Sequence, residues 1–374
     1  MAGLNHYDSK LLPSGTAQHY VALSTGIRLH YLELKPSIYG VKDNGITVVF
    51  VHGFPELSFS WKDQMKAVAQ SGYTAIAPDM RGYGFTDCPA EVDLYSTKYL
   101  GDDLDALLDS LGVSKAVFVG HDWGGFVVWS YVFQRENRCL AACVLNTPLS
   151  SWYKLRQKWE EAGCSGPMEY LKTRPSEETG ELDYQVYFNI PTIPEKELEA
   201  DVEKTINAFF RSQTPDRSRK DHFENMRIGM RTAKARKDNN RGVLFYCPEE
   251  LPRDPLWTDE EIQVYVSAFQ RTGFFGPLCW YRNIDENIRY SESLHCEPGL
   301  PGCKIVDVPC LMVTAEFDVV LSPESAKGMD EYFSNLSWGH VNCGHWTQKE
   351  QTLPVNSIIV EWLEKSLQPD HSKL

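Results

Sequence analysis

The chain has 374 residues, with 51 acidic and 37 basic side chains and a formal net charge of −14. This length supports a large hydrophobic core with an added lobe. An acidic surface repels phosphate groups, which excludes nucleic acids and anionic membranes as favoured partners. The polar start lacks a secretory signal, and no apolar run approaches the roughly 18 residues of a membrane span, so we expect reduced thiols in a cytosol-like compartment.

Short β-rich runs alternate with helical patterns in the first 150 residues. The runs predict strands over 28–34, 46–51, 73–77, 116–120 and 142–145. Leucines 100, 104, 107, 108 and 111 fall on one helical face, which predicts a helix that ends at Gly112. Alternating strands and helices indicate a mostly parallel sheet that is covered on both faces.

The rhythm changes after residue 149. Residues 150–295 carry aromatic and charged side chains, proline breaks and little strand signal, which predicts a helical lobe. Strands are expected again at 309–314 and 337–341, with helices near 322–333 and 353–367. We therefore predict an α/β fold whose core, residues 1–149 and 296–374, is interrupted by a helical cap over 150–295.

The strongest motif is GHDWGG at residues 120–125, between the predicted strand 116–120 and a helical run at 126–133. This pattern is typical of a nucleophile elbow, in which glycines allow the strand and helix to pack closely. Its central residue, Asp122, would project over the carboxyl edge of the sheet. A carboxylate is anionic at neutral pH and can attack a saturated carbon without a base.

The resulting ester must be cleared by water, and that step needs a base. Asp318 and His345 follow the last two predicted strands, in the chain order of nucleophile, acid and histidine. Glu316 and His340 are the alternatives for these two roles. Positions beyond the strand ends favour Asp318 and His345, because catalytic groups in open α/β sheets gather there.

The loop HGFPE at residues 52–56 also follows a predicted buried strand. Such a loop supplies one backbone N–H to an oxyanion hole, and the residue after the nucleophile supplies another, which nominates Phe54 and Trp123. Cys296, Cys303 and Cys310 do not match a zinc pattern, and no phosphate-binding glycine motif appears. We therefore expect neither a metal nor a cofactor.

Six motifs together, HGFPE, GHDWGG, DYQVYF, WYRN, TAEFD and CGHW, resemble the soluble epoxide hydrolases of the α/β-hydrolase fold, over about residues 20 to 366. HGFP and HDWGG also occur in related dehalogenases, and the two tyrosine motifs make the set specific. Mammalian members of the family carry an additional amino-terminal phosphatase domain. No such domain is expected in this chain, so the resemblance implies hydrolase activity only.

The resemblance implies that Asp122 is the nucleophile, His345 the base and Asp318 its orienting acid. It also implies that Tyr184 and Tyr281 are cap residues that donate hydrogen bonds to the epoxide oxygen, which becomes an alkoxide when the ring opens. The nearest competitor of Tyr184 is Tyr187. An aromatic substrate pocket is expected, including the side chains of Tyr187, Phe188 and Trp346.

These features predict an enzyme that hydrolyses lipophilic epoxides, such as fatty-acid epoxides, to vicinal diols. Two alternatives stay open: a haloalkane or haloacid dehalogenase on the same scaffold, and a non-catalytic ligand-binding member of the fold. Phe54 disfavours a dehalogenase, because common haloalkane enzymes carry Asn there.

The tripeptide Ser372-Lys373-Leu374 matches a peroxisomal address that is read by an import receptor. We therefore expect the protein in the peroxisome, in the cytoplasm or in both.

Overall fold

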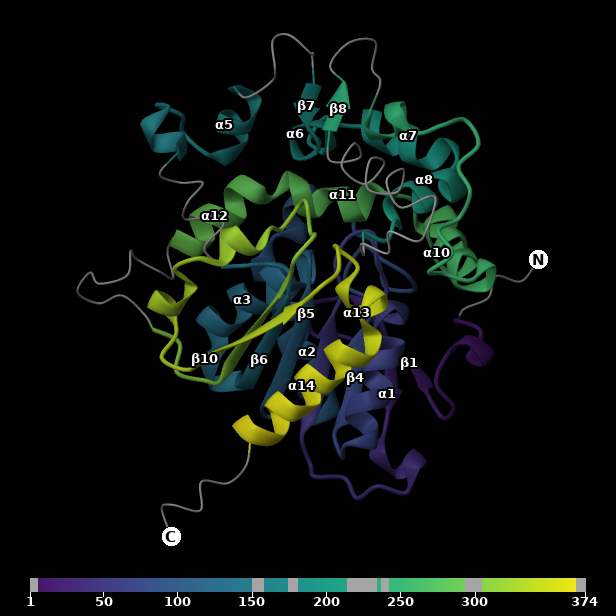
Figure 1. Ribbon diagram of the computed structural model, residues 1–374, viewed down its shortest axis with the longest axis vertical. Coiled ribbons are helices and arrows are strands. Elements are labelled where there is room, and N and C mark those ends of the chain that lie inside the picture. The colour runs from purple at the N-terminus through teal and green to yellow at the C-terminus, as the bar shows by residue number, and fades with distance from the viewer. Residues whose placement is uncertain are drawn as a thin grey trace.

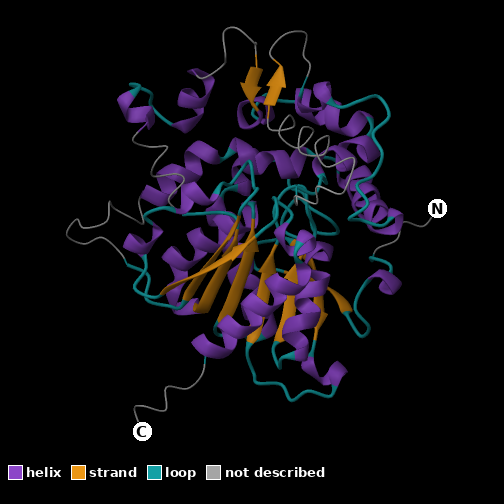
Figure 2. Cartoon of the chain, viewed as in Figure 1, coloured by secondary structure: helices purple, strands orange, loops and turns teal. Residues whose placement is uncertain are grey.

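The computed structural model describes residues 6–149, 158–173, 181–213, 234–236, 242–292 and 305–367. An eight-stranded sheet with helices on both faces forms the core, and a mostly helical lobe lies against one edge of it (Figures 1 and 2). The strand order is β1-β2-β4-β3-β5-β6-β9-β10. β2 pairs antiparallel with β1 and β4, and the other pairs are parallel, so the prediction of a mostly parallel sheet is confirmed.

The strands of the main sheet are β1 (Ala17–Ala22), β2 (Arg28–Leu34), β3 (Thr47–Val51), β4 (Thr74–Pro78), β5 (Ala116–His121), β6 (Cys139–Leu145), β9 (Cys310–Ala315) and β10 (Leu336–Val341). The core helices are α1 (Lys62–Gln70), α2 (Thr97–Leu111), α3 (Trp123–Arg135), α13 (Thr347–Glu350) and α14 (Thr352–Ser366).

The described elements between β6 and β9 build the lobe above the sheet (Figure 1). They are the helices α5 (Pro167–Thr173), α6 (Tyr184–Phe188), α7 (Ile193–Ala200), α8 (Val202–Phe209), α10 (Asp259–Thr272), α11 (Phe275–Arg282) and α12 (Ile284–Glu292), and a small antiparallel pair, β7 (Glu181–Asp183) and β8 (Lys234–Arg236). Both predicted cap boundaries adjoin or fall in segments outside the described residues, so they stay predictions.

Sequence pattern explains most of the core. Every residue of β3 and β5 is buried, as expected of parallel strands covered on both faces. The helix α2 ends at Leu111, because Gly112 adopts a left-handed conformation with φ 67° that closes it. α1 packs against α14 on one face of the sheet, and α2 packs against α3 on the other (Figure 1).

One predicted element is wrong. Residues 322–333 form two 3₁₀ turns, Pro323–Ala326 and Met329–Tyr332, in place of one helix. Gly328 separates the turns with a left-handed φ of 86°, which a continuous right-handed helix does not contain. The strand β1 was not predicted at all. Among the described residues, no helix is both long and apolar enough to cross a membrane.

Candidate active site

Asp122 stands at a sharp turn between β5 and α3, with φ 51° and ψ −124°. The flanking glycines make the turn possible. A Cβ on Gly124 would lie 2.0 Å from the carbonyl oxygen of Val51, and one on Gly120 would lie 2.5 Å from the oxygen of Gly124. Because only glycine fits both positions, the elbow holds Asp122 beyond the carboxyl end of its strand.

The two carboxylate oxygens of Asp122 have different surroundings. The Phe54 amide donates to Oδ1 at 2.8 Å, and the Trp123 amide also hydrogen-bonds to the carboxylate. Oδ2 lies 3.7 Å from Nε2 of His345. Burial raises the pKa of Asp122, although His345 and the two amides act in the opposite direction. The loop at Phe54 and the elbow thus supply two amide donors to the carboxylate, and Oδ2 faces the imidazole.

His345 is oriented by Asp318, whose Oδ2 lies 2.9 Å from its Nδ1. The other oxygen of Asp318 accepts hydrogen bonds from the amides of Val320 and Leu321, at 2.9 and 3.0 Å. In addition, the side-chain amide of Asn146 donates to Asp318 Oδ2 at 2.7 Å. The buried carboxylate is therefore fixed from both sides.

The charges of this pair reinforce each other. Burial alone would lower the pKa of His345, but Asp318, followed by Asp122 and Glu56, raises it to about 9. Burial alone would likewise raise the pKa of Asp318, yet the imidazole holds it well below its usual range. The carboxylates around His345 therefore favour the protonated form of its imidazole.

The sequence alternatives lie elsewhere. Glu316 and His340 pair with each other at 3.3 Å, and both side chains are half exposed. The structure brings Asp318 and His345 to Asp122 and leaves Glu316 and His340 at the surface.

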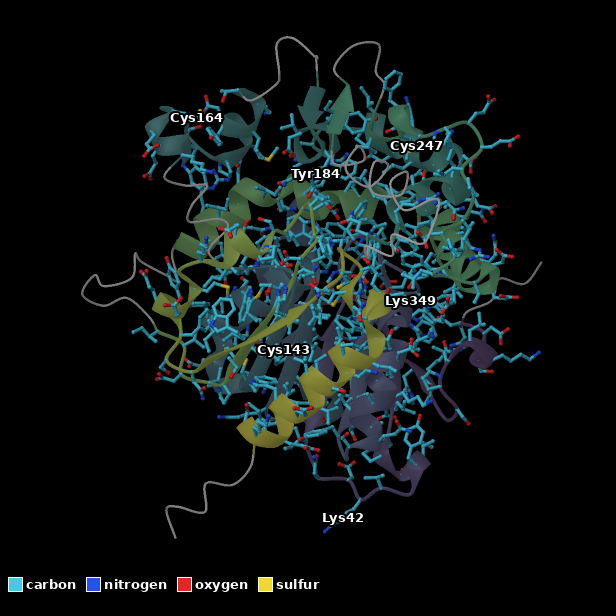
Figure 3. The ribbon with its side chains drawn as sticks, in the orientation of Figure 1. Lys42, Cys143, Cys164, Tyr184, Cys247 and Lys349 are labelled. Atoms are coloured by element: carbon cyan, nitrogen blue, oxygen red, sulfur yellow. The ribbon has the colours of Figure 1, made fainter. Side chains whose placement is uncertain are left out.

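The two tyrosines come from different cap helices and meet above Asp122. Tyr184 begins α6 inside the cap (Figure 3), and Tyr281 lies in α11. Their ring centroids are 5.8 Å apart, and the Tyr281 ring lies 5.2 Å from Phe54 and 5.0 Å from Trp123. Burial is the main reason that the pKa of each phenol is well above its usual value, and the charge of Asp122 adds to it. Both hydroxyls thus remain hydrogen-bond donors.

Two residues that sequence reasoning missed join the tyrosine helices. Asn189 follows α6, and its side chain donates to the carbonyl oxygen of Tyr281 at 3.2 Å and to that of Gln185 at 2.9 Å. Arg282, next to Tyr281, donates to the carbonyl oxygen of Phe188 at 3.2 Å and pairs with Glu195 at 2.7 Å. These bonds link the segment around α6 to α11.

The three predicted pocket residues lie in different places. Phe188 is buried and packs at 5.5 Å from Phe54 and 5.0 Å from Tyr281. Trp346 packs on His345 at 4.9 Å. The Tyr187 ring contacts that of Phe188 at 6.1 Å, and its place in the pocket stays a prediction.

The Tyr187 hydroxyl faces Glu197 of α7, and the pKa of Tyr187 is raised by burial and by the charge of Glu197. The charge of Asp122, by contrast, contributes to the raised pKa of Tyr184.

A buried polar chain supports His345 from behind. Glu56 Oε2 lies 2.7 Å from Nδ1 of His121, and Nε2 of His121 lies 2.8 Å from the carbonyl oxygen of His345. Gln348 donates to Oε1 of Glu56 at 2.5 Å. Burial opposes the ionised form, but His121 and the Gly53 amide lower the pKa of Glu56. Glu56, His121 and Gln348 each lie in or beside a motif found in the sequence. Their hydrogen bonds, however, join residues that are 65 and 292 positions apart in the chain.

Within the described ranges, no three His, Cys, Asp or Glu side chains are grouped so as to hold a metal ion.

The sheet order, the elbow and the acid–histidine pair define the α/β-hydrolase class. The α/β hydrolase fold family matches residues 46–179. The chain is 38% identical to bifunctional epoxide hydrolase 2 of Sus scrofa over 94% of its own length and 56% of the relative. It is 30% identical to epoxide hydrolase A of Mycobacterium tuberculosis, over 91% of this chain and 95% of that protein.

A solved structure, epoxide hydrolase A from Mycobacterium thermoresistibile, superposes with a TM-score of 0.74 at 29% identity, covering 93% of this chain and 98% of the other. The chain therefore belongs to the epoxide hydrolase family. It spans about half the length of the mammalian bifunctional relatives.

Proposed function

We propose that this protein hydrolyses lipophilic epoxides to vicinal diols through an ester on Asp122. The observation that carries the proposal is the position of that carboxylate. One oxygen rests on the Phe54 amide, the other faces His345, and Tyr184 and Tyr281 converge above it.

In the first step, Oδ2 of Asp122 attacks a ring carbon, and the carbon–oxygen bond of the strained ring breaks. Negative charge develops on the epoxide oxygen, where two neutral phenols donate hydrogen bonds. This oxygen becomes a hydroxyl by taking up the proton that the imidazolium of His345 releases, so that the imidazole is neutral when the second step begins. Because burial keeps Tyr184 and Tyr281 protonated, they provide donors without placing a fixed charge in the apolar pocket.

In the second step, water attacks Cγ of Asp122 while His345 Nε2 takes its proton. The ester carbonyl oxygen is Oδ1, which already accepts a hydrogen bond from the Phe54 amide, and the Trp123 amide also bonds to this carboxylate. Esterification removes the charge of Asp122, one of the three carboxylates that raise the pKa of His345. The imidazole therefore becomes easier to deprotonate when it must act as a base.

The surroundings of Asp122 favour an apolar substrate. The Tyr281 ring packs at 5.0 to 5.2 Å from the rings of Phe54, Phe188 and Trp123, and Phe54 and Phe188 lie 5.5 Å apart. Such a lining suits a hydrocarbon chain, and we include fatty-acid epoxides in the proposed substrate class.

An isotope experiment tests the covalent mechanism. After repeated turnover of an epoxide in ¹⁸O water, the peptide that holds Asp122 is isolated and weighed. Attack at Cγ places label in the carboxylate, whereas direct attack of water on the epoxide labels only the diol. Absence of label from Asp122 therefore contradicts the proposal.

The two alternatives make different predictions. A dehalogenase releases halide from a haloalkane of matching length, and it binds that halide through side-chain N–H donors, which Phe54 lacks. A non-catalytic receptor binds an epoxide without releasing a diol. Halide release and diol formation, measured on the same preparation, separate all three functions.

We also propose peroxisomal delivery through Ser372, Lys373 and Leu374, which lie outside the described residues. Deleting Leu374 from a fluorescent fusion should disperse a punctate signal. An unchanged distribution argues for the cytoplasm.

A further inference from the structure

The proposed ester would be shielded from water on the cap side. The rings of Tyr281, Phe188 and Phe54 already surround the nucleophile there, and the alkyl group of the substrate would fill the space that remains. Yet each turnover consumes one water molecule. The oxygen of this water bonds to Cγ of Asp122, and one of its protons passes to Nε2 of His345. The bond between Cγ and the alkyl oxygen then breaks, and the alkyl oxygen takes up the proton from His345.

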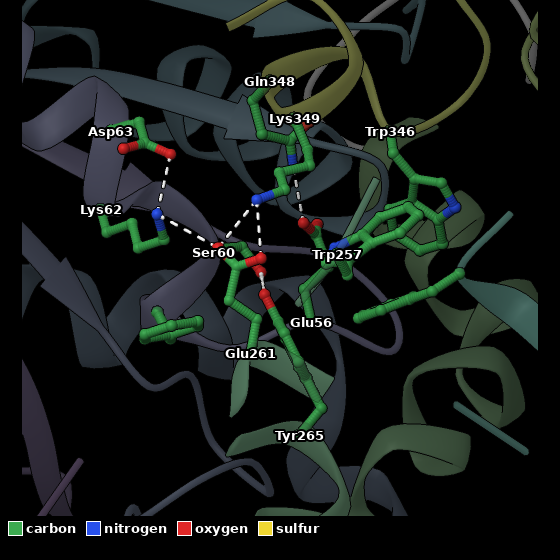
Figure 4. A pocket seen from close by; sticks show the side chains of 12 residues that line it. Glu56, Ser60, Lys62, Asp63, Trp257, Glu261, Tyr265, Trp346, Gln348 and Lys349 are labelled. Atoms are coloured by element: carbon green, nitrogen blue, oxygen red, sulfur yellow. Dashed lines mark hydrogen bonds and ion pairs between the residues drawn. The ribbon is translucent and has the colours of Figure 1, made fainter. Parts of the chain in front are cut away.

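A second pocket approaches the site from the flank, between α1, α10 and α13 (Figure 4). It has about 20 Å³ of room for the centres of water molecules, which is enough for one or two of them. Ser60, Tyr265 and Trp346 form its walls, and Glu56 and Gln348 lie in its lining. The pocket therefore reaches from the surface to the polar chain that supports His345.

The inner end of this pocket contains an unsatisfied hydrogen-bond acceptor. Gln348 is 3% exposed, and its Oε1 has no partner among the described residues. A buried amide oxygen without a donor is costly, and an ordered water is the usual remedy. Because Nε2 of the same side chain holds Glu56, water bound to Oε1 would lie next to that carboxylate.

The path from Glu56 to the reacting atoms is short. Glu56 Oε2 accepts a hydrogen bond from the Gly53 amide at 2.9 Å, and the Cα of Gly53 is so close to Asp122 that a Cβ there would lie 2.5 Å from Oδ1. His121 joins Glu56 to the main chain of His345. Only the Gly53 backbone and the His121 side chain separate Glu56 from the nucleophile and the base, so a local displacement of this packed layer would admit water between them.

The rim of the pocket is charged but already paired. Glu261 of α10 pairs with Lys62 at 3.3 Å and with Lys349 at 2.8 Å, as Figure 4 shows. An ionic ligand would have to break these pairs, whereas water solvates them. The rim thus favours water over a charged metabolite as the occupant.

We propose that this pocket, bounded by Ser60, Glu261 and Lys349, is the access route for the water that hydrolyses the Asp122 ester. Substrate arrives beneath the cap and water arrives from the flank, so neither blocks the other. The inference rests on the proposed function, because only a covalent intermediate requires a separate supply of water.

The test fills the pocket and measures the two chemical steps separately. Ser60→Leu adds bulk to the wall and removes the 2.8 Å hydrogen bond between Ser60 and the Tyr265 hydroxyl. Tyr265→Phe removes the same hydrogen bond and adds no bulk, so it is the matched control. Rapid-quench experiments give the rates of ester formation and ester hydrolysis.

We expect Ser60→Leu to slow ester hydrolysis by roughly tenfold or more, with ester formation within about twofold of wild type and accumulation of the ester. Tyr265→Phe should leave both rates unchanged. As a second variant, Ser60→Cys is labelled with a benzyl thiosulfonate after folding, so that the pocket is filled without a demand on folding. Untreated Ser60→Cys and treated wild type are its controls.

The outcomes are distinct. Wild-type hydrolysis in both filled variants overturns the access route, and so does equal slowing of both steps, which indicates a displaced nucleophile. If the wild-type protein forms no ester at all, the proposed function itself fails.

Discussion

The side-chain amide of Asn189 donates to the carbonyl oxygen of Tyr281 across 3.2 Å, and this bond links the two cap helices that carry the phenols. The same amide donates to the carbonyl oxygen of Gln185, the residue after Tyr184. One side chain therefore fixes both tyrosines relative to each other.

Asn189→Ala should lower the rate of ester formation by about tenfold, because a phenol that is displaced by even 1 Å stabilises the alkoxide less. Hydrolysis of the ester should be unchanged. Asn335→Ala, at an exposed asparagine before β10, is the control. Rapid-quench kinetics report both steps, and an unaltered rate of ester formation would show that Asn189 does not position the phenols.

Tyr184→Phe and Tyr281→Phe should each slow ester formation by on the order of 10²-fold, since each removes one donor to the developing alkoxide. Tyr187→Phe provides the comparison, because the Tyr187 hydroxyl faces Glu197. It should have little effect. If Tyr187→Phe were the most damaging of the three, the assignment of Tyr184 would be wrong.

The pKa of His345, about 9 in the free protein, should fall when Asp122 loses its charge. Removing a nearby anion disfavours the protonated imidazole, so the shift in Asp122→Asn is downward. NMR titration of the imidazole protons measures it. Asp63→Asn, which changes a carboxylate at the outer pocket rim, is the control and should leave the titration in place.

Stability should depend on the same group. The pKa of His345 is raised from about 6.5 in the unfolded chain to about 9. Its contribution is therefore complete below about pH 6.5 and is lost as the pH rises through 9, by up to about 3 kcal/mol. Urea unfolding at pH 6 and pH 9.5 should show this loss in wild type and a smaller one in His345→Gln. Identical losses in both proteins would contradict the prediction.

Gly124→Ala should destabilise the fold by at least about 3 kcal/mol, because the new Cβ would lie 2.0 Å from the Val51 carbonyl oxygen and neither backbone segment has room to move. Gly26→Ala is a control with φ 86° and nothing within 4 Å of the added Cβ. It should cost only about 1 to 2 kcal/mol for the unfavourable conformation. Equal costs in thermal unfolding would mean that packing at the elbow is not the reason for the glycine.

Periodicity predicted the elements whose burial is uniform. Strands such as β3 and β5 are buried along their whole length, so a run of apolar residues identifies them. The edge strand β1 has only partly buried or exposed residues, and it gives no such signal. Residues 322–333 carry a helical pattern, but the left-handed Gly328 interrupts it.

The residues of the candidate site likewise fall into a group that the sequence predicts and a group that it does not. Asp122, Asp318 and His345 follow strands, and strand ends in a parallel sheet converge. In contrast, Glu56, Gln348 and Asn189 act through hydrogen bonds to partners that only the folded chain brings near. A polar residue in a loop resembles any other until its burial is known, which explains why the supporting residues were missed.

The two oxygens of Asp122 have different hydrogen-bond partners, and this difference predicts which of them exchanges with ¹⁸O water during turnover. In the proposed mechanism, Oδ1 would stay on the Phe54 amide throughout the cycle, whereas Oδ2 would leave with every diol and be replaced from solvent. After the first turnover each product should carry an oxygen that entered one cycle earlier. The enzyme itself should therefore gain a single heavy oxygen, and the second should never exchange while the side chain keeps its orientation.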